Sequence, residues 1–211
     1  MSTAILVMGE SGSGKTTAMR NLDPKTTFYI DADGKGLSWR GWKKQYNVEN
    51  KNYVRIQDGN QILQLLGQIH EKKNIKTVVI DTINGIMLHK EMTDKTKGYD
   101  KWIDLADNAY QLVTRASMFR DDLTVIVLGH SETVQDDAGY VFTRLKTNGR
   151  KLEKIVLEAK FTTVLLAKGN EGKYVLETKA KNSTAKTPMG MFDQDEIDND
   201  ITIVLKEMED F

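Results

Sequence analysis

Short segments rich in apolar residues alternate along the first 130 residues with longer segments of helical spacing. The short segments are Ala4–Met8, Thr26–Asp31, Tyr53–Ile56, Thr77–Asp81 and Leu123–Leu128. A brief, uninterrupted apolar run is typical of a strand buried on both faces of a parallel sheet. We therefore predict five strands in this part of the chain.

Helices are predicted between these strands. Gln61–Glu71 and Trp102–Phe119 carry apolar residues at helical spacing. A first helix is predicted over Lys15–Asn21, and Asp23-Pro24 ends it because proline cannot continue a helix. Strands that alternate with helices predict an α/β fold, a mainly parallel sheet with helices on both faces.

The last third of the chain has a different pattern. Asp136–Gly149 is polar and is predicted to be a mobile loop. Thr162–Ala167 and Lys173–Thr178 flank Gly169-Asn170-Glu171-Gly172, which predicts a C-terminal β-hairpin. We interpret residues 1–211 as a single domain, because this length suits one well-buried α/β core and is short for two.

The composition is that of an ordinary globular protein, with 39% hydrophobic and 28% charged residues. The formal net charge is zero, so the chain as a whole offers no strong field to nucleic acid or membrane. The absence of cysteine excludes disulfides, Cys-ligated zinc and a thiol nucleophile. We find neither a signal peptide nor an apolar run long enough to span a bilayer, and we expect a cytosolic protein.

The first strand leads directly into a glycine-rich loop with the spacing G-x-x-x-x-G-K-T. Backbone N–H groups of such a loop converge on phosphate oxygens, and the dipole of a following helix adds to the attraction. We expect Lys15 to contact the β- and γ-phosphates of a nucleoside triphosphate and the Thr16 hydroxyl to bind Mg²⁺. The expected nucleotide-binding residues are Gly9, Glu10, Ser11, Gly12, Ser13, Gly14, Lys15, Thr16 and Thr17.

Three polar side chains follow predicted strands, at the edge where ligands bind in parallel sheets. Asp81 ends its strand, and we expect it to hold the Mg²⁺ shell, usually through water. Asp33 lies just past the second strand and is our candidate to orient or deprotonate the attacking water, although Asp-Gly is also a common turn. His130 is expected to sense the γ-phosphate and relay its loss to the following loop, with a simple strand-end histidine as the alternative.

Two segments combine aromatic and basic side chains. Tyr140–Lys151 interleaves them, which suits single-stranded DNA because bases stack on rings and cations follow the backbone. A solvated basic loop is an equally good interpretation of this segment. In the other segment, Trp39 and Trp42 fit either an ordinary core or a cover for the adenine ring. The candidate DNA-binding cations are Arg144, Lys146, Arg150 and Lys151.

Together, these motifs resemble the RecA-type branch of the phosphate-loop ATPases. Phe28–Asp33 resembles the RecA strand that carries the catalytic glutamate, although Asp33 is one methylene shorter. His130 falls where RecA and RadA proteins place a glutamine that senses the γ-phosphate. The basic loop Lys181–Gly190 resembles the loop whose lysine acts across subunits in RecA-type and DnaB-type rings, and of its lysines we favour Lys186. A solvated loop is the alternative there.

The chain also resembles small phage-encoded RecA-core ATPases, the Sak-type single-strand annealing proteins, through Gly9–Thr17, Arg40–Lys44, Gly98–Lys101 and Ala185–Phe192. The resemblance covers nearly the whole chain. It implies an ATPase that uses ATP and Mg²⁺ and couples nucleotide state to single-stranded DNA binding and annealing in phage recombination or replication. It further implies self-association into a ring or filament, a phage or host single-strand binding protein as partner, and a location in the host cytoplasm.

Two other functions are compatible with the phosphate loop. One is a nucleotide-gated assembly scaffold with little turnover, which the shorter carboxylate of Asp33 favours. The other is a small-molecule kinase, but such enzymes usually carry an arginine-rich lid, and no arginine cluster precedes Asp81.

Overall fold

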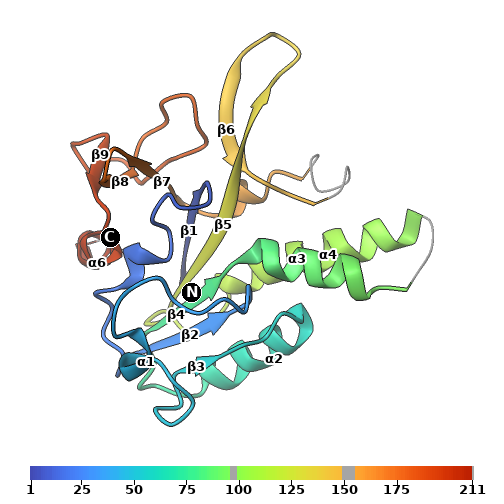
Figure 1. The fold of residues 1–211 in the computed structure, drawn as a ribbon, viewed down its shortest axis with the longest axis vertical. Helices are drawn as coiled ribbons and strands as arrows, with labels where there is room; N and C mark the ends of the chain where they lie inside the picture. The colour runs from blue at the N-terminus through green and yellow to red at the C-terminus, as the bar shows by residue number, and fades with distance from the viewer. Residues whose placement is uncertain (96–98, 149–154, 211) are drawn as a thin grey trace.

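The computed structural model describes residues 1–95, 99–148 and 155–210 (Figure 1). Its strands, in chain order, are β1 (Thr3–Gly9), β2 (Thr27–Asp31), β3 (Tyr53–Val54), β4 (Thr77–Asp81), β5 (Thr124–Gln135), β6 (Val141–Leu145), β7 (Thr163–Asn170), β8 (Lys173–Glu177) and β9 (Glu196–Asp198). In these described ranges they form one nine-stranded sheet in the order β3-β2-β4-β5-β1-β7-β8-β9, and β6 pairs with β5 outside this path.

The helices cover both faces of the sheet. They are α1 (Trp42–Gln45), α2 (Gly59–His70), α3 (Ile83–Thr93), α4 (Tyr99–Ala116) and α6 (Ile201–Glu207), with 3-10 turns η1 (Thr17–Met19), η2 (Leu157–Lys160) and η3 (Met208–Asp210). One core lies under α2, α3 and α4, and the other lies under η1 and α6. In the part of the chain that the structure describes, no helix is long and apolar enough to cross a membrane.

Alternation along each strand separates the two cores. Leu6 of β1 packs in the core under α2, α3 and α4, whereas Val7 packs in the core under η1 and α6. Because side chains on a strand alternate between faces, both faces of the central strands must be apolar, which explains their uninterrupted apolar runs. The predicted fold class, a mainly parallel sheet flanked by helices with a C-terminal β-hairpin, is confirmed.

Strand register brings the expected site to one edge of the sheet. β1, β2, β4 and β5 are parallel, so their carboxyl ends face the same way. Gly9 at the end of β1 is level with His130 on β5, and Asp31 at the end of β2 is level with Asp81. β5 lies between β1 and β4, and it therefore places His130 between the glycine-rich loop and Asp81.

The predicted first helix, Lys15–Asn21, is wrong. The chain forms only the short 3-10 turn η1, with an Ala18 N–H to Gly14 carbonyl bond before it. In an α-helix the Thr17 carbonyl would accept a hydrogen bond from the backbone N–H four residues later. Here it accepts instead from the backbone N–H and the guanidinium of Arg20. Helix dipole therefore adds little here, and the loop itself must supply the donors for phosphate.

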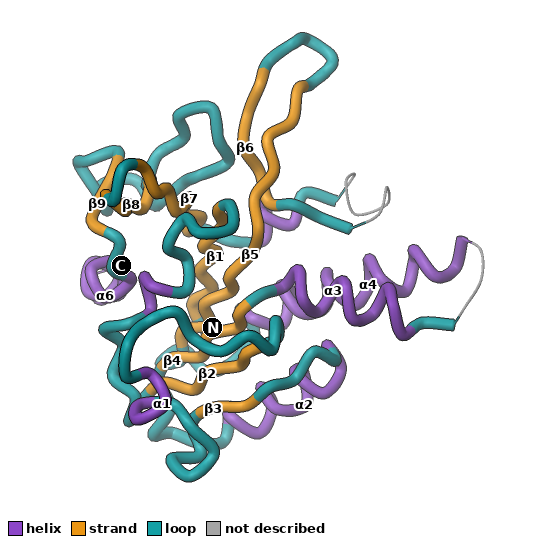
Figure 2. The backbone as a smooth tube through the Cα atoms, in the orientation of Figure 1, coloured by secondary structure: helices purple, strands orange, loops and turns teal. Residues whose placement is uncertain are grey.

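The predicted mobile loop Asp136–Gly149 is also wrong for the residues that the structure describes. β5 continues to Gln135, and β6 pairs back on it in a hairpin that projects beyond the sheet (Figure 2). The Asp136 carboxylate accepts hydrogen bonds from the backbone N–H of Ala138 and Tyr140, and Gly139 takes a φ of 85°, which closes the turn. Polar residues occupy these strands because much of the hairpin is solvent-exposed.

Candidate nucleotide-binding site

The glycine-rich loop follows β1 at the carboxyl edge of the sheet, and two of its glycines are required by space. A Cβ on Gly9 would lie 2.4 Å from the Ser13 hydroxyl oxygen and 2.6 Å from the Ala167 carbonyl oxygen. Gly14 has a φ of 93°, and a Cβ there would lie 3.0 Å from both Tyr174 and Asn199. The loop is therefore held tightly between β7 and the C-terminal part of the chain.

Lys15 is 5% exposed and turns back onto its own loop. Its Nζ donates to the carbonyl oxygens of Gly9, at 2.8 Å, and of Glu10, at 2.7 Å. Burial lowers the pKa of Lys15 to about 8, and the charge of Asp81 opposes that shift. A buried ammonium held only by neutral carbonyls is well placed to accept an anionic partner such as phosphate.

Thr16 and Asp81 meet at the base of the loop. The Thr16 hydroxyl donates to Asp81 Oδ2 at 2.7 Å, and the Tyr29 hydroxyl donates to the same oxygen at 2.9 Å. Burial raises the pKa of Asp81, and the hydrogen bond from Thr16 opposes this. Burial and the nearby Asp81 charge raise the pKa of Tyr29 well above its ordinary value, so Tyr29 remains a donor.

This pair of oxygen ligands fits Mg²⁺. Asp81 Oδ1 is buried and has no hydrogen-bond partner among the described residues. Its lone pairs are therefore available to a metal-bound water. No group of three or more His, Cys, Asp or Glu side chains in the described residues could hold a metal ion by itself. Mg²⁺ commonly takes one or two protein oxygens and completes its shell with phosphate and water, so Thr16 and Asp81 are sufficient.

Asp33 lies beside Asp81, across the end of β2. Its Oδ1 accepts from the Thr82 hydroxyl at 2.7 Å, and its Oδ2 pairs with Lys35 Nζ at 2.6 Å. Burial opposes ionisation, but hydrogen bonds from Lys35 and Thr82 lower the pKa of Asp33 below its ordinary value. Asp33 is therefore an oriented, ionised carboxylate and not a free turn residue.

His130 lies in the middle of β5 and lines the same cavity as Lys15 and Thr16. Burial, followed by the charge of Lys15, lowers the pKa of His130, which keeps the imidazole neutral at pH 7. The backbone N–H of His130 donates to Asn84 Oδ1 at 2.7 Å, and the Asn84 amide donates to the Lys146 carbonyl oxygen at 2.9 Å. Asn84 thus ties the His130 backbone to the residue after β6.

A cavity of about 280 Å³ joins most of these groups. Lys15, Thr16, Lys35 and His130 line it together with the glycine-rich loop and Tyr174. These lining residues come from four separate segments of the chain. Asp33 and Asp81 do not line the cavity themselves, but they contact Lys35 and Thr16, which do. Sequence reasoning missed Lys35, Tyr29 and Asn84; the Asp-Gly-Lys-Gly run after β2 was the available signal for Lys35.

The other expected residues lie outside this cavity. Lys186 is exposed, and its backbone pairs with Val164 of β7, so it does not line the phosphate cavity of its own chain. Lys181 forms a 3.0 Å ion pair with Asp195, whereas no carboxylate of the described residues pairs with Lys186. Of the two lysines, Lys186 is therefore the one whose charge is not paired with a carboxylate of the described residues.

The expected DNA-binding cations have different surroundings. Arg144 forms a 3.0 Å ion pair with Glu132 across the hairpin, Lys146 is exposed, and Arg150 and Lys151 lie outside the described residues.

The two tryptophans are largely committed to packing. Trp39 makes edge contacts with Tyr29 and Tyr46, and its ring N–H donates to Gln45. Trp42 packs against Tyr53. Of the two interpretations of Trp39 and Trp42, the ordinary core therefore fits.

Comparison with known proteins identifies a family and shows similarity to solved structures. The sequence model of a family described as an AAA domain, AAA_24, matches residues 1–188. None of the curated proteins matches the chain. Among solved structures, a KaiC-like protein from the hyperthermophilic archaeon Pyrococcus horikoshii OT3 is 16% identical, with a TM-score of 0.49 over 83% of this chain and 77% of that one.

Proposed function

The chain belongs to the AAA domain family, whose sequence model spans residues 1–188, and we propose that it is an Mg²⁺-dependent ATPase in which Asp33 positions the attacking water. One observation carries the proposal. Four residues carried by or following four neighbouring strands, β2, β4, β5 and β1, lie at one edge of the sheet: Asp33, Asp81, His130 and Lys15.

Each residue has a role that its surroundings support. Lys15 exchanges the carbonyls of Gly9 and Glu10 for phosphate oxygens of ATP when the nucleotide enters. Thr16 and Asp81 hold Mg²⁺, which neutralises charge on the β- and γ-phosphates. Their mutual hydrogen bond already places both oxygens at one point.

Asp33 and His130 act on the terminal phosphate. Asp33 accepts a hydrogen bond from the attacking water and orients it, while Thr82 and Lys35 hold the carboxylate in place. His130 is neutral and donates one ring N–H to the γ-phosphate, a contact that is lost when phosphate leaves. The sequence order and geometry therefore support hydrolysis with a sensed γ-phosphate.

A steady-state phosphate-release assay with Mg²⁺-ATP tests this function against a scaffold that only binds. Asp33→Asn should slow release by about 10²-fold, the usual size of a lost general-base contribution, and leave the ATP dissociation constant within about twofold. Thr82→Ser, which keeps the hydroxyl that holds Asp33, is the matched control. Full turnover in Asp33→Asn would assign the carboxylate role elsewhere, and transfer to a sugar or nucleotide acceptor would support a kinase.

We also propose that nucleotide state is coupled to single-stranded DNA through the hairpin, as the Sak-type resemblance implies. The β5–β6 arm, Ser131–Leu145, begins directly after His130 on the same strand. Tyr140 and Phe142 stack on this arm with ring centroids 6.0 Å apart, and Tyr140 is 52% exposed. Exposed rings on a projecting hairpin suit base stacking.

Assembly belongs to the same proposal. Lys186 is exposed and lies away from its own phosphate cavity, which suits a role at the nucleotide of a neighbouring subunit in a ring or filament. Mass measurement with and without Mg²⁺-ATP tests this: a larger species with ATP supports it, and an unchanged monomer contradicts it. If Lys186 acts in trans, mixing Lys186→Ala with Lys15→Ala should restore turnover above either variant alone.

A further inference from the structure

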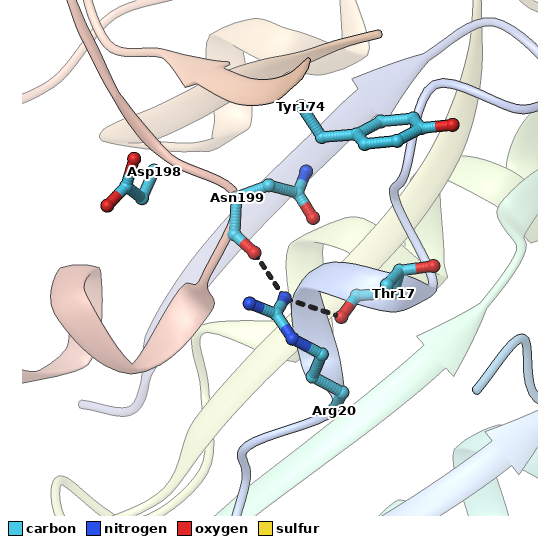
Figure 3. A pocket seen from close by; sticks show the side chains of 5 residues that line it. All are labelled: Thr17, Arg20, Tyr174, Asp198 and Asn199. Atoms are coloured by element: carbon cyan, nitrogen blue, oxygen red, sulfur yellow. Dashed lines mark hydrogen bonds between the residues drawn. The ribbon is translucent and has the colours of Figure 1, made fainter. Parts of the chain in front are cut away.

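A second cavity of about 400 Å³ lies beside the phosphate cavity. Thr17, Arg20, Tyr174, Asp198 and Asn199 line it (Figure 3). Thr17 and Tyr174 line both cavities, so the two spaces adjoin at the end of the glycine-rich loop. A triphosphate held by the loop would thus lead toward this second cavity, which we call the base pocket.

Asn199 is the unusual residue of the base pocket. It is 6% exposed, and neither its Nδ2 nor its Oδ1 has a hydrogen-bond partner among the described residues. Figure 3 shows its carboxamide directed between Tyr174 and Thr17, where both of its polar atoms lie close to Gly14 of the phosphate loop. Buried polar atoms are nearly always paired, so a buried donor and acceptor side by side indicate a missing partner that has one acceptor and one donor.

The base pocket is held in position from both ends. The Arg20 guanidinium donates to the carbonyl oxygens of Thr17 and Asn199 and bridges them (Figure 3). The Asn21 amide donates to the Asp200 carboxylate at 2.6 Å, just before α6. These bonds fix the Asn199 backbone against the phosphate loop, whereas no hydrogen bond among the described residues holds its carboxamide, which can turn toward a ligand in the cavity.

The chemistry of the Asn199 carboxamide favours adenine. An asparagine amide pairs in a bidentate way with N6 and N7 of adenine, which present one donor and one acceptor. On the same edge, guanine presents two acceptors, O6 and N7, and would leave the amide oxygen unpaired. The Asp198 carboxylate also lines the base pocket, on the other side of the backbone from the Asn199 carboxamide in Figure 3.

Tyr174 provides the apolar surface that a base requires. Its side chain comes from β8, contacts the backbone side of Gly14, and is 47% exposed. An exposed ring at the mouth of a polar cavity can cover one face of a heterocycle. The tryptophans near the phosphate loop are already packed against tyrosines, which leaves Tyr174 as the aromatic ring that lines both cavities.

We propose that the base pocket binds the adenine of the nucleotide, with the Asn199 carboxamide paired to N6 and N7 and the Tyr174 ring over one face. This inference rests on the proposed ATPase function and names the base that it selects. Sequence reasoning had no signal for it, because Asn199 lies more than 180 residues from the phosphate loop and in no recognisable motif.

Calorimetric titration with Mg²⁺ and ATP, GTP or inorganic tripolyphosphate tests the base pocket. The wild type should bind ATP roughly tenfold or more tightly than GTP, as expected for one bidentate base contact. Asn199→Ala should lose that preference and leave tripolyphosphate affinity unchanged. Tyr174→Ala should weaken ATP and GTP together and spare tripolyphosphate. Asn60→Ala, on the exposed start of α2, is the matched control and should behave as the wild type.

The possible outcomes distinguish a failure of the base pocket from a failure of the proposed ATPase function. If the wild type binds tripolyphosphate and ATP but Asn199→Ala keeps the wild-type ratio of ATP to GTP affinity, the base pocket is refuted and the ATPase proposal stands. If the wild type binds neither ATP nor tripolyphosphate, the ATPase proposal itself fails. Retained tripolyphosphate binding also shows that each variant is folded.

Discussion

The phosphate-binding edge and the β5–β6 arm share one strand but differ in how far their side chains are buried. At the edge, Lys15, Thr16 and Asp81 are at most 8% exposed, and their polar atoms are largely engaged by fixed partners. On the arm, Tyr140 and Val141 are 52% and 49% exposed. The edge is therefore organised before a ligand arrives, whereas the arm is a paired hairpin that presents exposed side chains to solvent.

Two side chains join these regions, the half-buried Asn84 and the buried Glu158. Asn84 ties the His130 backbone to Lys146, and Glu158 accepts a 2.8 Å hydrogen bond from the Leu145 N–H at the base of the arm. Leu145 is buried, so the arm is anchored at its base. Farther out, Thr143 pairs with Ser183, and the Tyr140 hydroxyl donates to Asn182 Oδ1 at 2.9 Å. A change at the γ-phosphate that moves His130 would therefore act on the arm at its root.

Lys15→Ala is the change with the largest expected effect, and it acts on the edge alone. The γ-phosphate loses its buried cation, so ATP turnover should fall by at least about 10²-fold and ATP binding should weaken. Single-stranded DNA binding measured without nucleotide should stay within about twofold of the wild type, since the arm keeps its structure. Phosphate release and DNA anisotropy measure the two effects. Unchanged turnover would exclude this loop as the catalytic site.

The edge was largely readable from the sequence because its signals are local. The loop Gly9–Thr16 and Asp81 are short motifs placed by strands whose apolar runs are unambiguous. Sheet register then converts separate strand ends into one site, as the pairing of Gly9 with His130 shows. The positions of Asp33 and His130 were therefore predictable, although their roles await the assays above.

The arm and the base pocket could not be predicted from the sequence, and the reason is physical. The arm is exposed over most of its length, so its strands carry Glu132, Thr133 and Gln135 in place of an apolar run. The first helix was overpredicted because Arg20, not the next turn of backbone, satisfies the Thr17 carbonyl. Asn199 is placed by contacts with Gly14 and Arg20, which lie at the other end of the sequence.

Removing the rings of the arm is expected to have the next largest effect, on DNA and not on turnover. Tyr140→Ala and Phe142→Ala should each weaken single-stranded DNA binding about tenfold, since stacking contributes roughly 1–3 kcal/mol per base. ATP turnover without DNA should remain at the wild-type rate. Tyr140→Phe keeps the ring and is the matched control. Equal DNA affinity in all four proteins would remove the arm from nucleic-acid binding.

Charge removal at the root of the arm should have a smaller and unequal effect. Lys146 is exposed, whereas the charge of Arg144 is already paired with Glu132. Lys146→Gln should therefore reduce the slope of log affinity against log salt concentration by about 0.7, one phosphate contact on a single strand, and Arg144→Gln by less. DNA titrations at several salt concentrations measure both slopes. A larger change in Arg144→Gln would show that DNA displaces Glu132.

The smallest expected effect concerns His130, where edge and arm meet, and it appears in stability. Burial and the charge of Lys15 lower the pKa of His130 below about 6.5, the value for an unfolded histidine. Below that pH the unfolded chain binds the proton more readily than the folded chain does. The contribution of His130 to stability is thus fully present above about pH 6.5 and is lost as the pH falls below that value.

Urea unfolding at pH 7.5 and pH 5.5 measures this contribution in the wild type and in His130→Gln. The wild type should lose more free energy of unfolding between the two pH values than the variant, with equal urea dependence in both. Because His130 is about half-buried, solvent screening keeps the difference small. Equal losses would mean that His130 titrates alike in both states, and that the junction between edge and arm is more open to water than its burial indicates.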